Sequence, residues 1–568
     1  MTDVRHTKSV SIQQKFKGGR GVAQPTSTMM QLGAVAHLAP SEDSELGRQI
    51  IAMVMRARGA AGNKPAARAP LTFAAYKEAI QKLDSIKRAL HQEHHSYNDV
   101  YVPGDGPELR RFVKMYNVER HTSDFGGYVN YVGAVHDALG EALLNMLRSS
   151  SMSQFRESDM AMHALVVGGS GSGKSELLKL MVHHYVKHPE LGAVLVLDPH
   201  RKLTREIARW REFARTPERL VYLDAAPDEN PEMVPAFNPL AGSVGDVDKA
   251  NLATQLADAV GILRENDSIT GNMVSVSKHC LRVLLDVPGA TLLDLRTMMR
   301  ADKNHPLTRA ALNTPDATVR EFFERGFFDG SLESARQAVA KRLDDALFAP
   351  LLRRMLTAPQ PFDLQAAVEG RKIICVDCGS VGPHADNTLG RLVMAQVAAL
   401  GLRRIYNRNL PQTPLHVFVD EATRLTSPSV FTILEQLRKV GISLTIGQQR
   451  LGDGLDRGLA GKVRDNTAIK LFGRNASMGE ILKIINWDGE IPRLRNGQFI
   501  AAWGDAETVL LDTMASPHLA DDSNAMAAAD WAKVMQYQLA AHYRPAMPPA
   551  GAMLPASSAL DPMDEYPA

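Results

Sequence analysis

Residues 168–175 read GGSGSGKS, a full match to the phosphate-binding pattern GxxxxGK[ST]. The apolar run 164–167 precedes this loop and the stretch 176–181, rich in helix formers, follows it, so the motif has the strand, glycine loop and helix that it requires. Glycines let backbone N–H groups turn inward around a polyphosphate, and the following helix N-terminus adds partial positive charge there. A flexible linker would need neither the terminal Lys-Ser pair nor the apolar flank. The sequence therefore predicts a nucleoside triphosphate site.

Within this loop, individual residues have distinct expected roles. Lys174 can reach the β- and γ-phosphates, and Ser175 can ligate Mg²⁺. The residues predicted to hold the nucleotide are Gly168, Gly169, Ser170, Gly171, Ser172, Gly173, Lys174, Ser175 and Glu176.

The composition is that of a globular protein with several structural units. A chain of 568 residues is too long for one compact core and suggests roughly three to four units. The net charge of only +2 provides no global field toward nucleic acid, so any such binding needs a local basic patch or a pore. Three cysteines do not make a disulfide framework and fit a reducing cytosol. We expect Cys375 and Cys378 to be core residues, and we expect the protein to be cytoplasmic without an integral membrane segment, because no apolar run approaches about 18 residues.

The chain divides into predicted units by pattern. Residues 1–70 carry ten Lys/Arg against four Asp/Glu and are expected to be a flexible basic arm, and 71–155 is expected to be a helical N-terminal unit. The first and second parts of an α/β core are predicted at 156–245 and 351–515, separated by an inserted helical subdomain at 246–350. A C-terminal helix at 516–543 and a Pro/Ala-rich acidic tail at 544–568 complete the chain. The alternation of strand and helix predicts a mostly parallel sheet, with strands at 164–167, 193–198, 219–223, 372–377, 415–420, 443–446 and 468–472.

A second part of the site is predicted at the end of the strand 415–419, where Asp420 and Glu421 follow an apolar run. Asp420 can hold Mg²⁺ and Glu421 can polarise the water that attacks the γ-phosphate, which indicates a hydrolase rather than a kinase. The next strand ends in two glutamines, and Gln449 or Gln448 could contact the γ-phosphate or the attacking water.

One arginine is predicted to act on the nucleotide of a neighbouring subunit. Arg438 ends the helix before that strand, and an arginine supplied in trans neutralises the charge that develops in phosphoryl transfer. Arg464 and Arg474 are alternatives for this role, and a solvated surface arginine is the simplest alternative.

With these residues placed, the chain resembles the FtsK/HerA superfamily of hexameric DNA-translocating ATPases, especially its HerA-like and conjugative coupling-protein branches. Six blocks carry the resemblance in the family's order, at 163–175, 194–200, 237–240, 417–422, 438–450 and 494–499. The resemblance implies a RecA-like P-loop NTPase core that hydrolyses ATP with Mg²⁺ at subunit interfaces. It also implies Gln449 as the sensor, Glu421 as the catalytic base and Arg438 as the trans-acting arginine. The membrane spans of coupling proteins and the small N-terminal β-barrel of HerA proteins are not identified.

The resemblance implies a homohexameric ring that moves DNA through a central pore by phosphate contacts. Two other functions stay open: an ATPase that energises a conjugation or secretion assembly, and an ATP-dependent scaffold that activates a partner nuclease. An ABC transporter ATPase is disfavoured because no LSGGQ-type signature lies between the phosphate loop and Asp420.

Overall fold

A computed structural model gives the fold. It describes residues 29–36, 96–97, 100–101, 151–228, 230, 232–241, 245–263, 269–358, 361–382, 385–407, 409–422, 427–450, 457–474, 476, 494–503, 509–513 and 524–545.

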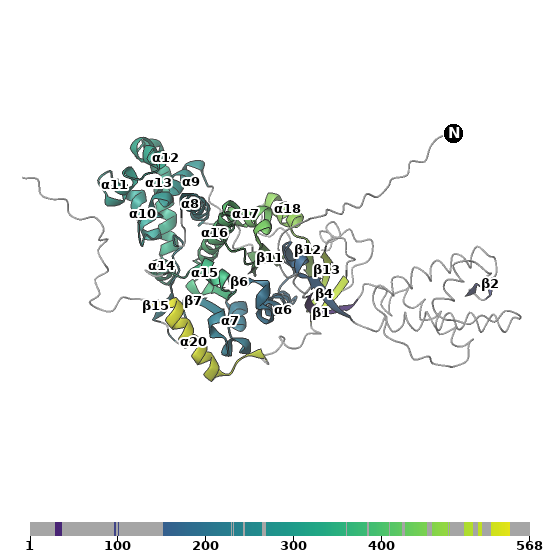
Figure 1. The fold of residues 1–568 in the computed structure, drawn as a ribbon. Helices are drawn as coiled ribbons and strands as arrows, with labels where there is room; N and C mark the ends of the chain where they lie inside the picture. Colours follow the sequence, from purple (N-terminus) through teal and green to yellow (C-terminus); the bar gives the residue numbers. More distant parts are fainter. Residues whose placement is uncertain are drawn as a thin grey trace, which may run out of the picture.

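The centre of the molecule is a sheet of seven parallel strands, in the order β12-β5-β11-β10-β6-β9-β7 (Figure 1). Their bounds are β5 Ala164–Val167, β6 Ala193–Asp198, β7 Leu220–Asp224, β9 Ile373–Asp377, β10 Leu415–Val419, β11 Ile442–Gln448 and β12 Ile469–Gly473. All seven strands predicted from the sequence are present, with small shifts at their ends. The predicted mostly parallel α/β fold is confirmed.

Helices cover both faces of this sheet, which explains why its strands are apolar without alternation. On one face, α6 (Lys174–Lys187), α7 (Lys202–Ala208) and α20 (Ala528–His542) pack on one set of strand residues. On the other face, α16 (Ala385–Tyr406) and α17 (Pro428–Gln436) pack on the alternate set, and the helical insertion packs on these two helices in turn. Cys375 and Cys378 are buried free thiols in this core, as expected.

Four antiparallel strands extend the sheet beyond β12, and the sequence patterns did not reveal them. They follow in the order β13, β14, β1 and β4, with bounds β13 Gln498–Trp503, β14 Val509–Asp512, β1 Met29–Ala36 and β4 Ser151–Arg156. The expectation that 1–70 is a flexible arm is therefore wrong for β1, and that of a helical unit at 71–155 is wrong for β4. Each pairs with a strand far away in sequence, a partnership that local composition does not encode.

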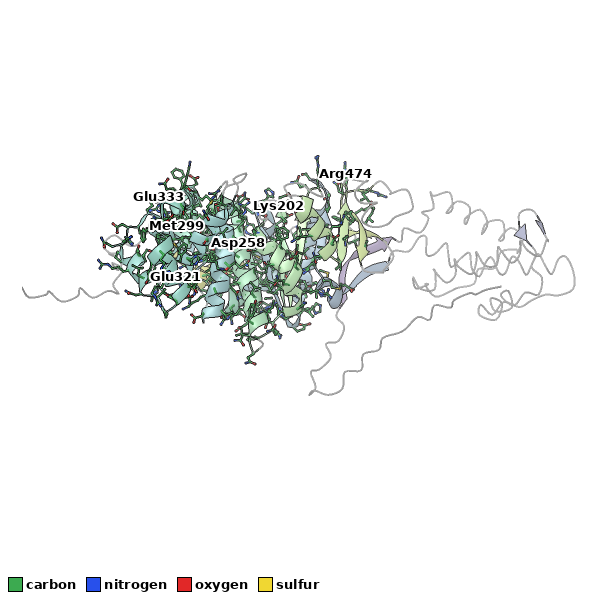
Figure 2. All side chains as sticks on the ribbon, turned by 90° about the horizontal axis from the view of Figure 1, so that it is seen from above. Lys202, Asp258, Met299, Glu321, Glu333 and Arg474 are labelled. Carbon is green, nitrogen blue, oxygen red and sulfur yellow. The ribbon has the colours of Figure 1, made fainter. Side chains whose placement is uncertain are left out.

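The predicted helical insertion is present as a separate lobe. Its helices are α8 Asp246–Gly261, α9 Gly271–Leu284, α10 Leu292–Arg300, α11 Pro306–Leu312, α12 Ala317–Glu321 and α13 Gly330–Leu347. Helices α14 Pro350–Leu356 and α15 Leu364–Glu369 return the chain to β9. Figure 2 shows the lobe, marked by Met299, Glu321 and Glu333, at the opposite end of the body from Arg474. The sheet and the site are therefore separated from most of the insertion.

The C-terminal helix α20 packs across the end of the core. It is followed by β15 (Tyr543–Pro545), which pairs antiparallel with β8 (Met233–Pro235), the segment that leads into the insertion. The predicted helix is thus confirmed, and the chain continues into a strand where a tail was expected to begin.

Most of the predicted N-terminal unit lies outside the described residues, as do 546–568 of the tail. Within that unit, which was expected to be helical, β2 (Ser96–Tyr97) and β3 (Val100–Tyr101) pair as a short hairpin that the sequence patterns did not predict. In the part of the chain that the structure describes, no helix combines the length and the apolar character that crossing a membrane requires.

Candidate nucleotide site

The phosphate loop connects β5 to α6 at the carboxyl edge of the sheet. Gly171 and Gly173 have φ of 72° and 93°, values that favour glycine over any other residue. Gly173 is the N-cap of α6 and offers no side chain to accept from the first-turn N–H groups. Those donors, together with the positive end of the helix dipole, remain for an anion. The loop therefore fits a polyphosphate.

The two predicted halves of the site meet directly. The Ser175 hydroxyl donates to Asp420 Oδ2 at 2.9 Å, and Lys174 Nζ lies 3.1 Å from Asp420 Oδ1 and 3.4 Å from Glu421 Oε2. Asp420 and Glu421 are 6% and 7% exposed, so this charge cluster is nearly closed to water. Ser175 and Asp420 offer neighbouring oxygen atoms, the donors that Mg²⁺ prefers. The residues present thus fit a magnesium nucleotide.

Glu421 has an unusual backbone conformation. Its φ is 63°, in the left-handed region that costs a non-glycine residue about 1–3 kcal/mol. The turn immediately after β10 sends the carboxylate back toward Lys174. Backbone strain of this kind is typical of functional sites, where a side chain must be held in one direction.

Strand β11 lies between β5 and β10, so its carboxyl end sits between the loop and the carboxylates. Here Gln448 is 1% exposed, and neither its amide nitrogen nor its amide oxygen has a hydrogen-bond partner among the described residues. The main-chain carbonyl oxygen of Gln448 accepts a hydrogen bond from Gly168 N at 3.0 Å. Gln449, assigned as the sensor from the resemblance, is exposed. A buried amide without partners is costly, which makes Gln448 the more unusual of the two glutamines.

A further segment, not assigned a role from the sequence, closes against the phosphate loop. Gly497 N donates to Ser172 O at 2.8 Å, and a Cβ on Gly173 would lie only 2.8 Å from the Cα of Gly497. Arg474 O accepts from Gly169 N at 3.0 Å, and its guanidinium bonds Asn496 at 2.9 Å. Arg474 therefore lies beside the phosphate loop of its own subunit. The Asn-Gly dipeptide before β13 was the available sequence signal for this tight turn.

Arg438 lies at the other edge of the sheet. It is exposed in the 3-10 turn Leu437–Val440, which comes just before the amino end of β11. The seven residues of β11 separate it from the phosphate loop by about 23 Å. Burial and the positive charge of Arg438 lower the pKa of His163, which precedes β5 at this same edge, to about 4. Arg438 therefore cannot reach the nucleotide of its own chain. Arg464 lies on α18 (Arg457–Asn466), where it pairs with Asp465 at 2.8 Å.

Asp198, at the end of β6 beside β10, has its own hydrogen bonds. It accepts from His200 N at 2.7 Å and Thr204 N at 3.2 Å, and so holds the start of α7. Burial, the main cause, and the nearby charge of Asp420 raise its pKa. Asp198 is thus a structural neighbour of the site.

The aspartates that end β7 and β9 form a separate cluster. Arg201 donates to Asp377 and Asp224 at 3.0 Å each. Burial first, and then the charge of Asp224, raise the pKa of Asp377 to about 7. No group of three or more His, Cys, Asp or Glu side chains suited to a metal ion occurs among the described residues.

Comparison with known families gives one match, at the phosphate loop. The family model described as "Helicase HerA, central domain" matches residues 155–202, from the end of β4 to the start of α7. The resemblance to the FtsK/HerA superfamily is therefore confirmed for this part of the chain. No curated protein matches the sequence.

Two solved structures illustrate the proteins to which this fold is similar. The plasmid coupling protein TrwB in complex with the non-hydrolysable GTP analogue GDPNP is 16% identical, with a TM-score of 0.44, covering 64% of this chain and 88% of TrwB. VirB4 of Thermoanaerobacter pseudethanolicus is 15% identical, with a TM-score of 0.40, covering 63% of this chain and 90% of VirB4.

Proposed function

We propose that this chain is an ATP-hydrolysing motor of the HerA/FtsK type that moves DNA through the pore of a homohexameric ring in the cytoplasm. Hydrolase activity is supported chiefly by two sets of contacts at the carboxyl edge of the sheet: Lys174 lies beside Asp420 and Glu421, and Ser175 donates to Asp420. The match to the HerA central domain at 155–202 supports the motor class.

The chemistry follows from the positions of these side chains. The loop N–H groups and Lys174 bind the phosphates of ATP, while Ser175 and Asp420 hold Mg²⁺. When bound, Mg²⁺ neutralises phosphate charge and orients the γ-phosphate. Glu421 accepts the proton of the attacking water, because its carboxylate lies beside Lys174, the residue that binds the phosphates.

The arginine that neutralises charge in the transition state comes from the neighbouring subunit in this proposal. Arg438 is exposed and stands at the sheet edge opposite the phosphate loop of its own chain. Ring closure would bring it to the neighbour's loop, which couples hydrolysis in one subunit to the position of the next.

ATP hydrolysis measured with and without DNA tests the proposal. We expect ATP turnover to rise in the presence of double-stranded or single-stranded DNA. The Glu421→Gln variant should lower ATP turnover by about 10²-fold or more while ATP binding persists. Lys174→Ala should instead abolish tight ATP binding. Normal hydrolysis by Glu421→Gln would refute the base assignment.

The same measurement separates the motor from the two other functions. A pure oligomer whose ATP turnover ignores every form of DNA would contradict DNA translocation. Binding to a secretion or conjugation component without DNA affinity would indicate the energising ATPase, and a co-purified nuclease that depends on this chain would indicate the scaffold.

A further inference from the structure

Helix α16 contains a deeply buried arginine side chain. Arg404 is 2% exposed, and its Nη2 has no hydrogen-bond partner in the described part of the chain. Burial lowers the pKa of its guanidinium, and the charge of Glu369 opposes that change. Among the described residues Arg404 has no paired carboxylate and a single directed contact, and burying an arginine in this way is energetically costly.

That contact is with the turn that carries Arg438. Arg404 Nη1 donates to Val440 O at 3.2 Å. One helical turn earlier, α16 approaches the same segment so closely that a Cβ on Gly401 would lie 2.4 Å from Leu437 Cδ1. The two ends of the turn Leu437–Val440 are therefore fixed on α16, the first by packing and the last by a charged hydrogen bond.

The turn itself has a consistent orientation. Leu437 and Val440 are buried, whereas Arg438 and Lys439 are exposed. Gly441 closes the turn through its N–H to Arg438 O at 3.1 Å and has a φ of 76°. Anchoring the two buried residues on α16 thus determines the direction in which the two cations project.

We propose that Arg404 is a positioning residue, which holds the turn Leu437–Val440 so that Arg438 faces the nucleotide of the neighbouring subunit. This inference rests on the proposed function, in which Arg438 acts in trans. A charged donor is suited to the task because its hydrogen bond to a carbonyl in a dry environment is stronger than a neutral one. A displacement of about 1 Å at a catalytic group can cost about 10²-fold in rate.

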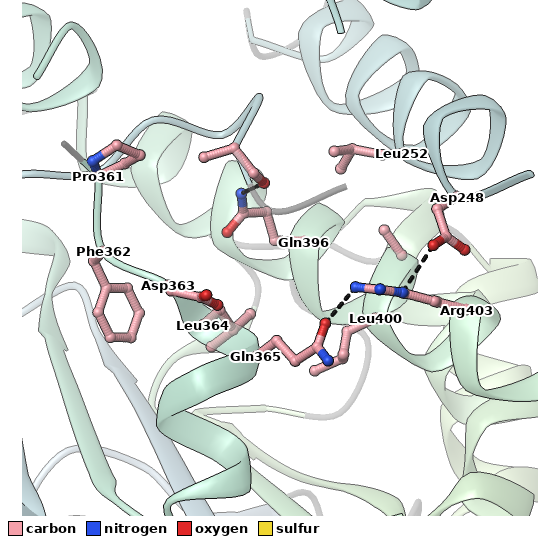
Figure 3. Close-up of a pocket in the computed structure, with 12 residues that line it drawn as sticks. Asp248, Leu252, Pro361, Phe362, Asp363, Leu364, Gln365, Gln396, Leu400 and Arg403 are labelled. Atoms are coloured by element: carbon pink, nitrogen blue, oxygen red, sulfur yellow. Dashed lines mark hydrogen bonds and ion pairs between the residues drawn. The ribbon is translucent and has the colours of Figure 1, made fainter. Parts of the chain in front are cut away.

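The neighbouring Arg403 provides a matched control. It lies on the same helix but forms an ion pair with Asp248, whose Oδ2 is 2.8 Å from its Nε, and donates a hydrogen bond to Gln365 Oε1. The three residues Arg403, Asp248 and Gln365 line a cavity of about 270 Å³ between α8, α15 and α16, on the side of the helical insertion (Figure 3). Arg403→Met therefore removes a part-buried charge from α16 whose contacts with Asp248 and Gln365 lie on the side of the insertion.

The test uses mixed rings of full-length subunits and measures ATP turnover. Arg404→Met alone should retain ATP binding and lose about 10²-fold in kcat. Mixed with Lys174→Ala subunits, which cannot bind ATP but have an intact Arg438 turn, it should regain activity. Mixed with Arg438→Ala subunits it should stay inactive, because both variants lack the same donor function. Arg404→Lys, which keeps a charged donor, should recover part of the lost kcat.

Each contrary result has a distinct meaning. Recovery in the mixture of Arg404→Met with Arg438→Ala would overturn the inference, because it would place the defect in the variant's own site. Failure with Lys174→Ala subunits, or an equal loss in Arg403→Met, would also overturn it in favour of general damage to α16. No recovery in the mixture of Arg438→Ala with Lys174→Ala would refute the trans arginine, and the inference with it.

Discussion

At the scale of single residues, the two glutamines that end β11 differ in a way the sequence does not show. Gln448 is buried on the strand between the phosphate loop and Glu421, with both amide atoms unpartnered among the described residues, whereas Gln449 is exposed. A bound nucleotide with its attacking water would supply partners to such an amide. The structure therefore favours Gln448 for the role that the resemblance gives to Gln449.

We predict that Gln448→Leu lowers kcat by about 10-fold or more, because the amide that would orient water or the γ-phosphate is lost. ATP binding, measured by fluorescence titration, should change little. Gln449→Leu is the matched control, and a larger loss of kcat in that variant would return the role to Gln449.

His163 gives a prediction for pH. Its pKa is lowered to about 4, with burial as the larger cause and Arg438 as the second, so the folded state disfavours the charged imidazole. The unfolded chain binds this proton near pH 6.5, and stability is therefore lost as the pH falls from about 6.5 toward 4. Between pH 7 and pH 5 the loss is about 2 kcal/mol.

Urea unfolding at several pH values checks this expectation. The difference in unfolding free energy between the wild type and His163→Asn should shrink as the pH falls, because only the wild type has the unfavourable imidazole. A difference that does not depend on pH would contradict the assignment.

At the scale of elements, the C-terminal helix is part of the core. Gln538 on α20 is fully buried and bonds to three backbone groups beside β7: Tyr222 N at 3.0 Å, Pro217 O at 3.1 Å and Leu220 O at 2.9 Å. The Tyr543 hydroxyl donates to Tyr222 O at 2.8 Å and accepts from Asp224 N at 2.9 Å. These contacts attach α20 and the start of β15 to the outer parallel strand β7.

We predict that Gln538→Leu lowers the unfolding free energy by about 2–5 kcal/mol, because it leaves buried backbone groups without partners. Gln536→Leu, at an exposed position of the same helix, should change it by no more than about 0.5 kcal/mol. Thermal unfolding of both variants distinguishes the two effects. Equal stability of the two would refute a structural role for Gln538.

A deletion of the tail should start at residue 546 rather than 544, because Arg544 and Pro545 belong to β15. Removing 546–568 should leave ATP turnover intact. Loss of activity or of the oligomer in that deletion would show that the tail contributes to the ring.

At the scale of the whole molecule, β1 joins segments that lie hundreds of residues apart. It pairs on one side with β14, where Ala34 faces Asp512, and on the other with β4, where Met29 faces Arg156. Without β1, β4 would lose its neighbour in the described sheet and β14, still paired with β13, would become an open edge, a known route to aggregation.

We therefore predict that deleting 1–40 lowers the melting temperature and promotes aggregation, whereas deleting 1–28 leaves both unchanged. Differential scanning calorimetry and light scattering on the two truncations measure this contrast. Equal behaviour would mean that β1 adds nothing to the stability of the sheet.

The sequence by itself determined the parallel core, the phosphate loop and the carboxylates. Each parallel strand is an apolar run buried on both faces, and the loop and Asp420-Glu421 are short patterns whose chemistry depends only on local spacing. Tertiary structure decided which distant segments pair and which side chains are left without partners. The antiparallel strands β1 and β4, the closure of Gly497 on Gly173, the buried amide of Gln448 and the anchoring of Val440 by Arg404 all arise from contacts between residues far apart in the chain. Local composition does not record such contacts, because they form only when packing brings those residues together.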